Sequence, residues 1–188
     1  MAQPKHTVRI IGGKWKGRKL KVADRRELRP TMSRVRETLF NWLSLEVSDA
    51  HVLDLFAGTG VLSFEALSRG ASFATLLDRD RVVTNYLRAE ARKLGANCEV
   101  VTTSAPLWLE RQSVWPWDIV FLDPPFKSNL IERVLPHLIQ RDVMVYVEQH
   151  RRDFVDDFPG WNIVKSGHAG EVCFRLLRPG DSIVEPQK

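Results

Sequence analysis

Along most of the chain, the spacing of apolar residues has one of two periods, one typical of strands and the other typical of helices. From residue 51 onward, short apolar runs of strand type alternate with stretches whose apolar residues have helical spacing. The predicted strands cover residues 51–56, 73–77, 98–101, 118–122 and 143–148, and the predicted helices cover 60–70, 80–94, 104–112 and 129–139. This alternation favours right-handed βαβ units and a mostly parallel sheet with helices on both faces, which is an α/β fold.

The two ends of the chain depart from this alternation. Residues 161–177 predict two strands around a loop at 166–170, which would add an antiparallel hairpin to the sheet and bring it to seven strands. Residues 8–22 predict a small hairpin that turns at Gly12–Gly13 or at Gly17. Residues 33–47 predict a helix capped by Thr31 or Ser33. We therefore expect a β extension at residues 1–30 and an α/β domain at 31–188.

Composition adds a cellular context. The 188 residues contain no apolar run near the roughly 20 residues that a membrane span needs, and the first ten residues show no secretory signal. Cys98 and Cys173 lie far apart in the sequence, and no His or Cys spacing is typical of a metal site. We expect a cytoplasmic protein with reduced thiols and without a metal, and one compact domain favours a monomer.

Positive charge is concentrated at the amino terminus. Residues 1–36 contain twelve Lys or Arg and two acids, a net charge of +10, whereas residues 37–188 carry −5. A basic arm on a mildly acidic body predicts a polyanionic partner. A solvated tail would have the same composition, but the apolar residues of 8–22 favour a folded arm.

The first strand of the alternating region ends in DLFAGTG, residues 54–60. Gly58 and Gly60 allow a tight turn close to a ligand, but Ser63 replaces the third glycine of the dinucleotide fingerprint GxGxxG. The acid Asp54 would repel a phosphate and suits a cationic group such as an amino-acid ammonium. Asp78 ends the next strand, where a carboxylate can accept hydrogen bonds from both ribose hydroxyls.

A ligand with a ribose, an ammonium group and no phosphate is S-adenosylmethionine. Ser104 and Ala105 follow the third strand, where a side chain and a backbone N–H could contact adenine. The predicted cofactor-binding residues are Asp54, Phe56, Ala57, Gly58, Gly60, Asp78, Arg79, Ser104 and Ala105.

The fourth strand ends in FLDPPF, residues 121–126. Asp123 and the Pro124 carbonyl can each accept one N–H of an exocyclic amine, and the two prolines hold these acceptors rigidly. Phe126 can stack on a base, which must be unpaired or flipped to reach this place. Asp123, Pro124, Pro125 and Phe126 are therefore the predicted catalytic residues. A lone DPPF could equally form only a tight turn; its position after DLFAGTG favours the methyl-acceptor pocket.

Five segments together resemble one family. Residues 9–20, 28–43, 54–71, 76–80 and 123–126 are similar to the RsmD-type bacterial methyltransferases. This resemblance implies a Rossmann-like class I methyltransferase fold and methylation of the N2 amine of one guanine in 16S ribosomal RNA. It also implies that the substrate is a nearly assembled small ribosomal subunit.

On this interpretation the basic arm would hold RNA phosphates, with Trp15 available for stacking. The predicted RNA-binding residues are Arg9, Lys14, Trp15, Arg18, Arg29, Arg34 and Arg36. Two alternatives stay open from the residues alone: a DNA adenine-N6 or cytosine-N4 methyltransferase, which would share the DPP pocket, and an RNA-binding module without catalysis.

Overall fold

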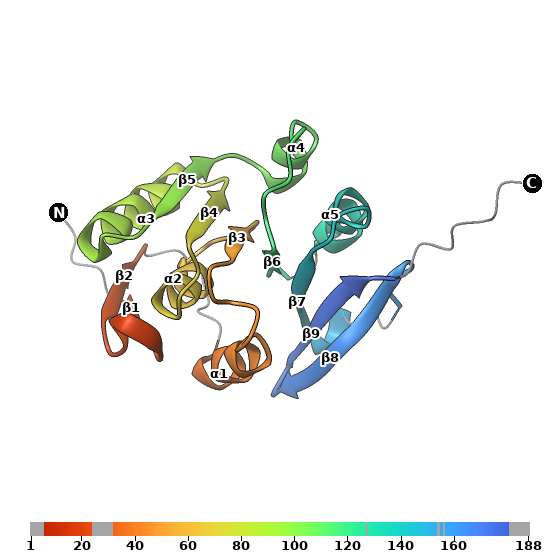
Figure 1. Cartoon of the computed structure of the whole chain (residues 1–188), viewed down its shortest axis with the longest axis horizontal. Helices are drawn as coiled ribbons and strands as arrows, with labels where there is room; N and C mark the ends of the chain where they lie inside the picture. The colour runs from red at the N-terminus through yellow and green to blue at the C-terminus, as the bar shows by residue number, and fades with distance from the viewer. Residues whose placement is uncertain (1–5, 24–31, 127, 154, 156, 181–188) are drawn as a thin grey trace, which may run out of the picture.

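The structure, a computed structural model, describes residues 6–23, 32–126, 128–153, 155 and 157–180 (Figure 1). Its larger sheet has seven strands in the order β5-β4-β3-β6-β7-β9-β8. These are β3 (His51–Asp54), β4 (Phe73–Asp78), β5 (Cys98–Thr102), β6 (Ile119–Leu122), β7 (Met144–His150), β8 (Trp161–Ala169) and β9 (Val172–Pro179). Strands β3 to β7 are parallel, and β9 runs antiparallel to both of its neighbours. The predicted α/β fold with a terminal antiparallel hairpin is confirmed.

Helices cover both faces of this sheet (Figure 1). The first face packs on α1 (Ser33–Trp42), α2 (Val61–Ser68) and α3 (Arg81–Leu94), and the second packs on α4 (Ala105–Leu109) and α5 (Leu130–Leu138). Alternate residues of each strand supply the two cores: Val52 and Phe121 belong to the first, Leu53 and Leu122 to the second. Within the described residues, no helix combines the length and apolar character that a bilayer span requires.

The amino-terminal segment forms the predicted hairpin. Strand β1 (His6–Arg9) pairs antiparallel with β2 (Lys19–Val22), and the short 3-10 helix η1 (Gly13–Trp15) lies between them. Ile10, Trp15 and Leu20 are buried in the same core as α1 and α2. The basic segment is therefore folded against the α/β body, whereas the predicted boundary at residue 30 lies outside the described residues.

Three details of the predicted elements are wrong. Helix α1 ends at Trp42 rather than at 47, and its N-cap is Met32, whose side chain makes no capping bond; Thr31 lies outside the described residues. The predicted loop at 166–170 is mostly strand, because Ser166 to Ala169 pair with β9. The chain instead turns at Gly170, whose φ of 57° is a left-handed conformation that glycine adopts without strain.

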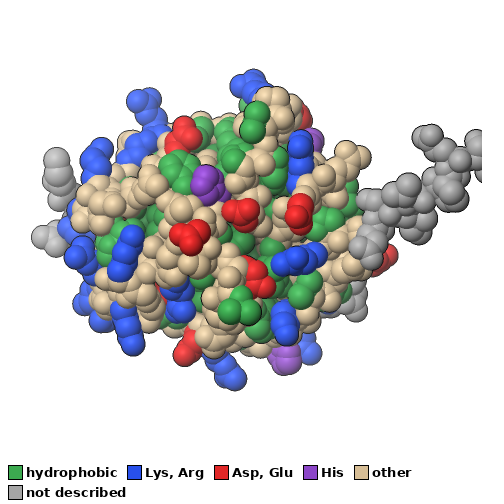
Figure 2. Space-filling view, viewed as in Figure 1, with side chains coloured by type: hydrophobic (Ala, Val, Ile, Leu, Met, Phe, Trp, Pro, Cys, Tyr) green, Lys and Arg blue, Asp and Glu red, His purple; other side chains and the backbone are tan. Residues whose placement is uncertain are grey.

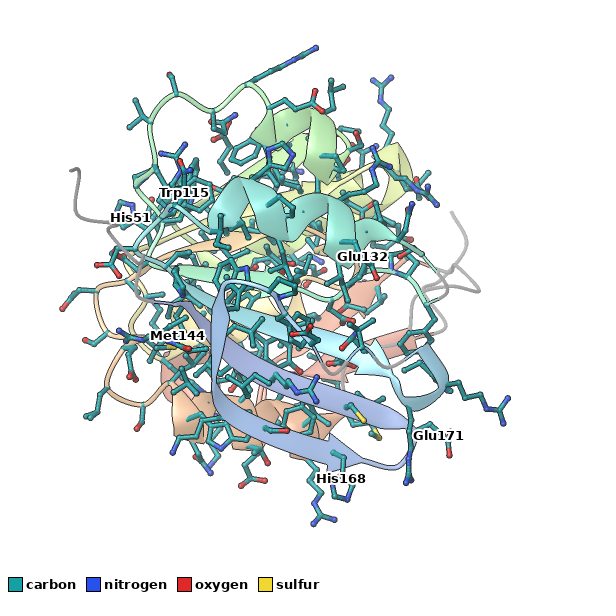
Figure 3. The ribbon with its side chains drawn as sticks, turned by 90° about the vertical axis from the view of Figure 1, so that its right-hand side faces the viewer. His51, Trp115, Glu132, Met144, His168 and Glu171 are labelled. Carbon is teal, nitrogen blue, oxygen red and sulfur yellow. The ribbon has the colours of Figure 1, made fainter. Side chains whose placement is uncertain are left out.

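The parallel strands β3 to β7 all begin on one side of the sheet, here called the amino edge, and all end on the opposite side, the carboxyl edge. His51 and Met144, which begin β3 and β7, lie at one side of the side view, and Glu171 lies at the other (Figure 3). Glu171 marks the carboxyl edge, since its carbonyl accepts from the Arg151 N–H directly after β7. Ligands of open α/β sheets bind at the carboxyl edge, which is where the predicted site residues follow their strands.

Candidate active site

Asp54 is the last residue of β3 and is 2% exposed. Its Oδ2 accepts a hydrogen bond of 2.8 Å from the Ser63 hydroxyl in the first turn of α2. Burial raises the pKa of Asp54 to about 7, although the bonds from Ser63 and from the Phe56 N–H lower it. Such a carboxyl group is poised to ionise when a cation arrives, because a neighbouring positive charge favours its charged form.

Asp78 ends the adjacent strand β4 and is held by two backbone N–H groups. Gly58 N–H donates to its Oδ2 at 3.1 Å, and Asp80 N–H donates to its Oδ1 at 2.8 Å. Burial raises the pKa of Asp78, and these two bonds lower it. Each oxygen keeps acceptor capacity, so the carboxylate can receive the two hydroxyls of a ribose.

The turn between these carboxylates requires glycine at Gly60. This residue caps α2 with φ of 72°, and a Cβ there would come within 2.5 Å of Leu87 Cδ2. Gly58 is also left-handed, with φ of 49°. The turn thus brings a backbone N–H to Asp78 while it starts α2, which positions both acids at one edge. Two carboxylates beside this turn fit a cationic ligand with a diol better than a pyrophosphate, because they would repel its negative charge.

The remaining predicted cofactor residues also follow the carboxyl ends of β3, β4 and β5. Phe56 is half-buried and Ala57 is buried, and the Ala57 N–H donates to the Leu77 carbonyl at 2.8 Å. Arg79 is exposed. Ser104 is exposed at the N-cap of α4 and makes no side-chain capping bond, and Ala105 behind it is buried. A hydroxyl that does not cap its own helix can contact a ligand.

The DPPF turn follows β6, the strand next to β3. Asp123 is half-buried, Pro124 is buried, Pro125 is exposed and Phe126 is 39% exposed. The Ser128 hydroxyl donates to the Pro125 carbonyl at 2.7 Å and closes the turn. An accessible ring thus stands beside an acid at the same edge as Asp54, an arrangement that can hold a flat base next to the cofactor residues.

Strand β7 adds polar residues that the sequence analysis missed. The Tyr146 hydroxyl donates to Glu148 Oε2 at 2.8 Å, and both residues are buried. The His150 ring packs edge-on against Phe126 with ring centroids 5.1 Å apart. A signal for Glu148 was available: it is an acid at the end of a predicted core strand, as Asp54 and Asp78 are.

The predicted RNA-binding residues divide into two groups. Arg9, Lys14, Arg18 and Arg34 are exposed, as is the neighbouring Lys16. Trp15 is 6% exposed and packs in the core, so its ring is not available for stacking on a base. Arg36 is 1% exposed and donates to the Arg9 carbonyl and to Glu65, which corrects its prediction as a phosphate ligand. Arg29 lies outside the described residues.

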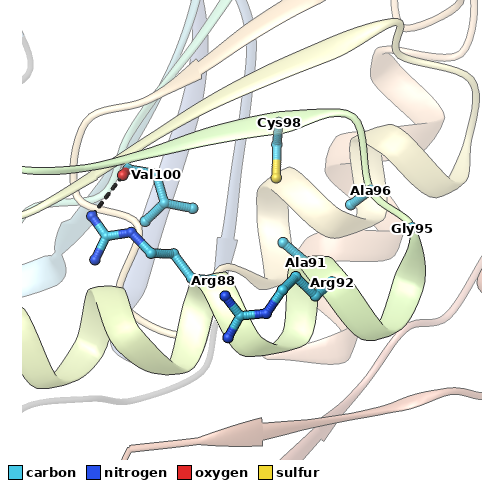
Figure 4. A pocket seen from close by; sticks show the side chains of 7 residues that line it. All are labelled: Arg88, Ala91, Arg92, Gly95, Ala96, Cys98 and Val100. Carbon is cyan, nitrogen blue, oxygen red and sulfur yellow. Dashed lines mark hydrogen bonds between the residues drawn. The ribbon is translucent and has the colours of Figure 1, made fainter.

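Two hollows lie away from the carboxyl edge. One, of about 260 Å³, lies between α3 and β5 and contains Cys98 and Arg88, whose guanidinium donates to the Val100 carbonyl at 2.8 Å (Figure 4). The other, of about 370 Å³, lies at the amino edge beside Asp118 and Asp142. That edge faces the viewer in Figure 2, with acids near its middle and Lys and Arg gathered at the left over β1, β2 and α3.

Asp54 is expected to make stability depend on pH. Its folded pKa of about 7 exceeds the unfolded value of about 4, so its contribution is present below pH 4 and is lost as the pH rises through 7. From pH 5 to pH 8 the free energy of unfolding should fall by about 1–3 kcal/mol more in the unsubstituted protein than in Asp54→Asn. Urea titrations measure this difference. Asp118→Asn, at an exposed acid, is the control, and equal slopes for Asp54→Asn would refute the assignment.

Comparisons with known proteins agree with this geometry. The chain matches the model of the family described as Conserved hypothetical protein 95 over residues 8–178. It is 42% identical to the ribosomal RNA small subunit methyltransferase D of Escherichia coli K12, with 95% of each chain covered. It is 40% identical to the Haemophilus influenzae protein of the same name, with 93% of this chain and 95% of the relative covered.

Solved structures show the same fold. The yhhF protein of Escherichia coli, described as a methyltransferase, superposes with a TM-score of 0.84 at 41% identity over 93% of this chain and 99% of that one. An RNA methyltransferase of Salinibacter ruber in complex with S-adenosyl-L-homocysteine shares the fold, with a TM-score of 0.65 at 13% identity over 85% of this chain and 99% of that one. The chain belongs to the RsmD-type family of small-subunit ribosomal RNA methyltransferases.

Proposed function

We propose that this protein transfers a methyl group from S-adenosylmethionine to the exocyclic N2 amine of one guanine in 16S ribosomal RNA. The observation that carries the proposal is the placement of the Asp123–Phe126 turn beside Asp54 and Asp78 at one edge of the sheet. Family membership supports the small-subunit RNA as the substrate class. A nearly assembled subunit is the proposed form of that substrate, and the enzyme is proposed to act as a monomer.

The residues at the ends of β3, β4 and β5 would hold the cofactor. Asp54 would face its ammonium group, Asp78 its ribose hydroxyls, and Ser104 and Ala105 its adenine. Phe56, Ala57 and Arg79 would line the same space. When bound, the cofactor supplies a methyl group on a positively charged sulfur, so the protein has to position the acceptor rather than create the electrophile.

The DPPF turn would position the guanine. Asp123 and the Pro124 carbonyl accept the two N–H groups of N2, which aims the nitrogen lone pair at the methyl carbon. The N–C bond forms as the S–C bond breaks, and the electron pair of that bond stays on sulfur. N2 then releases one proton to the Asp123 carboxylate that already accepts its N–H. Phe126 stacks on the base and keeps it out of the RNA helix.

Exposed basic residues of the hairpin are expected to set the salt dependence of RNA binding. Each phosphate contact that is lost should lower the slope of log K against log salt by about 0.7–0.9. The double variant Lys14→Gln, Arg18→Gln should therefore bind small subunits with a slope smaller by about 1.5. Filter binding at several salt concentrations measures it. Arg133→Gln, exposed on α5 at the other face, is the control and should leave the slope unchanged.

Methyl transfer tests the proposed function directly. Labelled S-adenosylmethionine is offered with small subunits from cells that lack this modification, with naked 16S RNA and with unmethylated DNA, and the product is mapped by nuclease digestion. The expected result is a single N2-methylguanine in the subunit RNA, with less label in naked RNA. Label in DNA, or in none of the three acceptors, would overturn the proposal.

A further inference from the structure

The row of side chains on β7 continues into the proposed guanine pocket. Asp54, Phe121 and Tyr146 are partners in the registers of β3, β6 and β7, so they form one row on one face of the sheet. Two residues further along, alternation of side chains places Glu148 of β7 on the same face. Asp123 directly follows Leu122, the last residue of β6, and its charge acts on Tyr146 as that of Glu148 does. Glu148 therefore stands at the rim next to the acid proposed to hold the amine.

Glu148 is a buried acid with few hydrogen-bond partners. It is 5% exposed, and its hydrogen bond within the described part of the chain is the one from the Tyr146 hydroxyl to Oε2. No Lys, Arg or His among the described residues forms an ion pair with it. Buried carboxylates are normally paired or fully hydrogen-bonded. A buried acid with a free acceptor oxygen is suited to a ligand that brings its own donor.

The protonation states of the pair are consistent with this role. Burial raises the pKa of Glu148 to about 7, although the bond from Tyr146 lowers it, so the ionised and protonated forms are both populated near neutral pH. Burial and the charges of Glu148 and Asp123 raise the pKa of Tyr146 well above its usual range. The Tyr146 hydroxyl therefore keeps its proton and donates it to Glu148 Oε2, which fixes the direction of the carboxylate.

Guanine presents adjacent donors on its Watson–Crick edge, N1–H and the N2 amine, and ionised carboxylates only accept. We infer that Glu148 accepts the N1–H of the target guanine, beside Asp123 on the N2 amine, and so selects guanine over bases that lack this hydrogen. The inference rests on the proposed function and adds the residue that determines base choice. At adenine N1 a lone pair would face the carboxylate, which repels it.

The test compares guanine with 2-aminopurine at the methylated position. 2-Aminopurine keeps the C2 amine that receives the methyl group, but it has a lone pair in place of N1–H and a hydrogen in place of O6. The change of the base preference in the Glu148 variants, and not the preference alone, therefore reports on the N1–H contact. Small subunits are reconstituted around 16S RNA joined by splinted ligation from a synthetic oligonucleotide that carries either base at the mapped nucleotide. The readout is the ratio of kcat/KM for the two substrates, in which losses common to both bases cancel.

The unsubstituted protein should prefer guanine by about 10- to 100-fold, the range for one charged hydrogen bond. In Glu148→Gln the ratio should fall to within about fivefold, because the amide can donate to N1 of 2-aminopurine. Tyr146→Phe, which keeps the ring and removes the hydroxyl that orients Glu148, should lower the ratio partially. Glu90→Gln, at a buried acid of α3 that pairs with Lys93, is the control and should leave the ratio unchanged.

The outcomes separate this inference from the proposed function. A ratio that stays at the unsubstituted value in both Glu148→Gln and Tyr146→Phe would overturn the role of Glu148 while methyl transfer to guanine persists. Equal use of guanine and 2-aminopurine by the unsubstituted protein would overturn it too. Transfer to neither base would overturn the proposed function itself, and the inference with it.

Discussion

Asp123→Ala is expected to lower kcat for methyl transfer by about 100-fold or more, because the amine loses the acceptor that aims its lone pair and takes its proton. The affinity for S-adenosylmethionine should change by less than about threefold, since the proposed cofactor contacts come from β3, β4 and β5. Single-turnover transfer to small subunits measures the rate, and calorimetric titration measures the cofactor affinity.

Asp118→Ala is the matched control for this experiment. Asp118 precedes the same strand β6 at its amino end, is exposed, and accepts from the His51 N–H at 2.8 Å. It should keep kcat within about threefold, since a surface polar contact contributes little. Full turnover by Asp123→Ala would show that the Asp123 carboxylate is not an acceptor of the amine.

Glu65→Ala is expected to destabilise the protein by about 3–5 kcal/mol, because it removes the partner of a buried cation. Glu65 is fully buried on α2, where Oε2 accepts from the Ile11 N–H at 2.9 Å and from Arg36 at 3.3 Å, and Oε1 accepts from Arg69 at 2.9 Å. Burial lowers the pKa of Arg36, and the charge of Glu65 offsets part of this effect. Without Glu65, the hairpin also loses a hydrogen bond to the body.

Thermal and urea unfolding measure this loss, which should lower Tm by roughly 6–20 °C for a chain of this size. Glu37→Ala removes the same charge from an exposed position of α1 and should change stability by less than about 0.5 kcal/mol. Similar stabilities of the two variants would show that the buried contacts of Glu65 do not hold the hairpin.

The edge of the sheet was predictable because it depends on order along the chain. Asp54, Asp78 and Asp123 each follow an apolar run, and parallel strands bring such ends together. Glu148 follows the same rule, since the predicted strand at 143–148 ends at this acid, although β7 itself continues to His150 through its pairing with β9. An antiparallel neighbour supplied from residues 172–179 decided that boundary, and local sequence does not contain it.

Basic residues were less predictable than acids. Helical spacing leaves Arg36 near the apolar stripe of α1, and its burial depends on Glu65, 29 residues away in the sequence. Trp15 also depends on a distant partner, since its backbone N–H donates to Ser68 Oγ of α2 at 2.8 Å. Charge counts locate a basic segment, but only the tertiary partners determine which of its side chains face solvent.

The contacts between the hairpin and α2 also bear on the order of folding during synthesis. The hairpin leaves the ribosome before α2, yet the backbone N–H groups of Ile11 and Trp15 donate to Glu65 and Ser68 of α2, which lie 54 and 53 positions later in the chain. Domains form as their segments emerge, and contacts of such separation wait for the later partner. The nascent basic segment therefore has no core to fold on until α2 has been made, and during that interval it is an unfolded polycation beside ribosomal RNA.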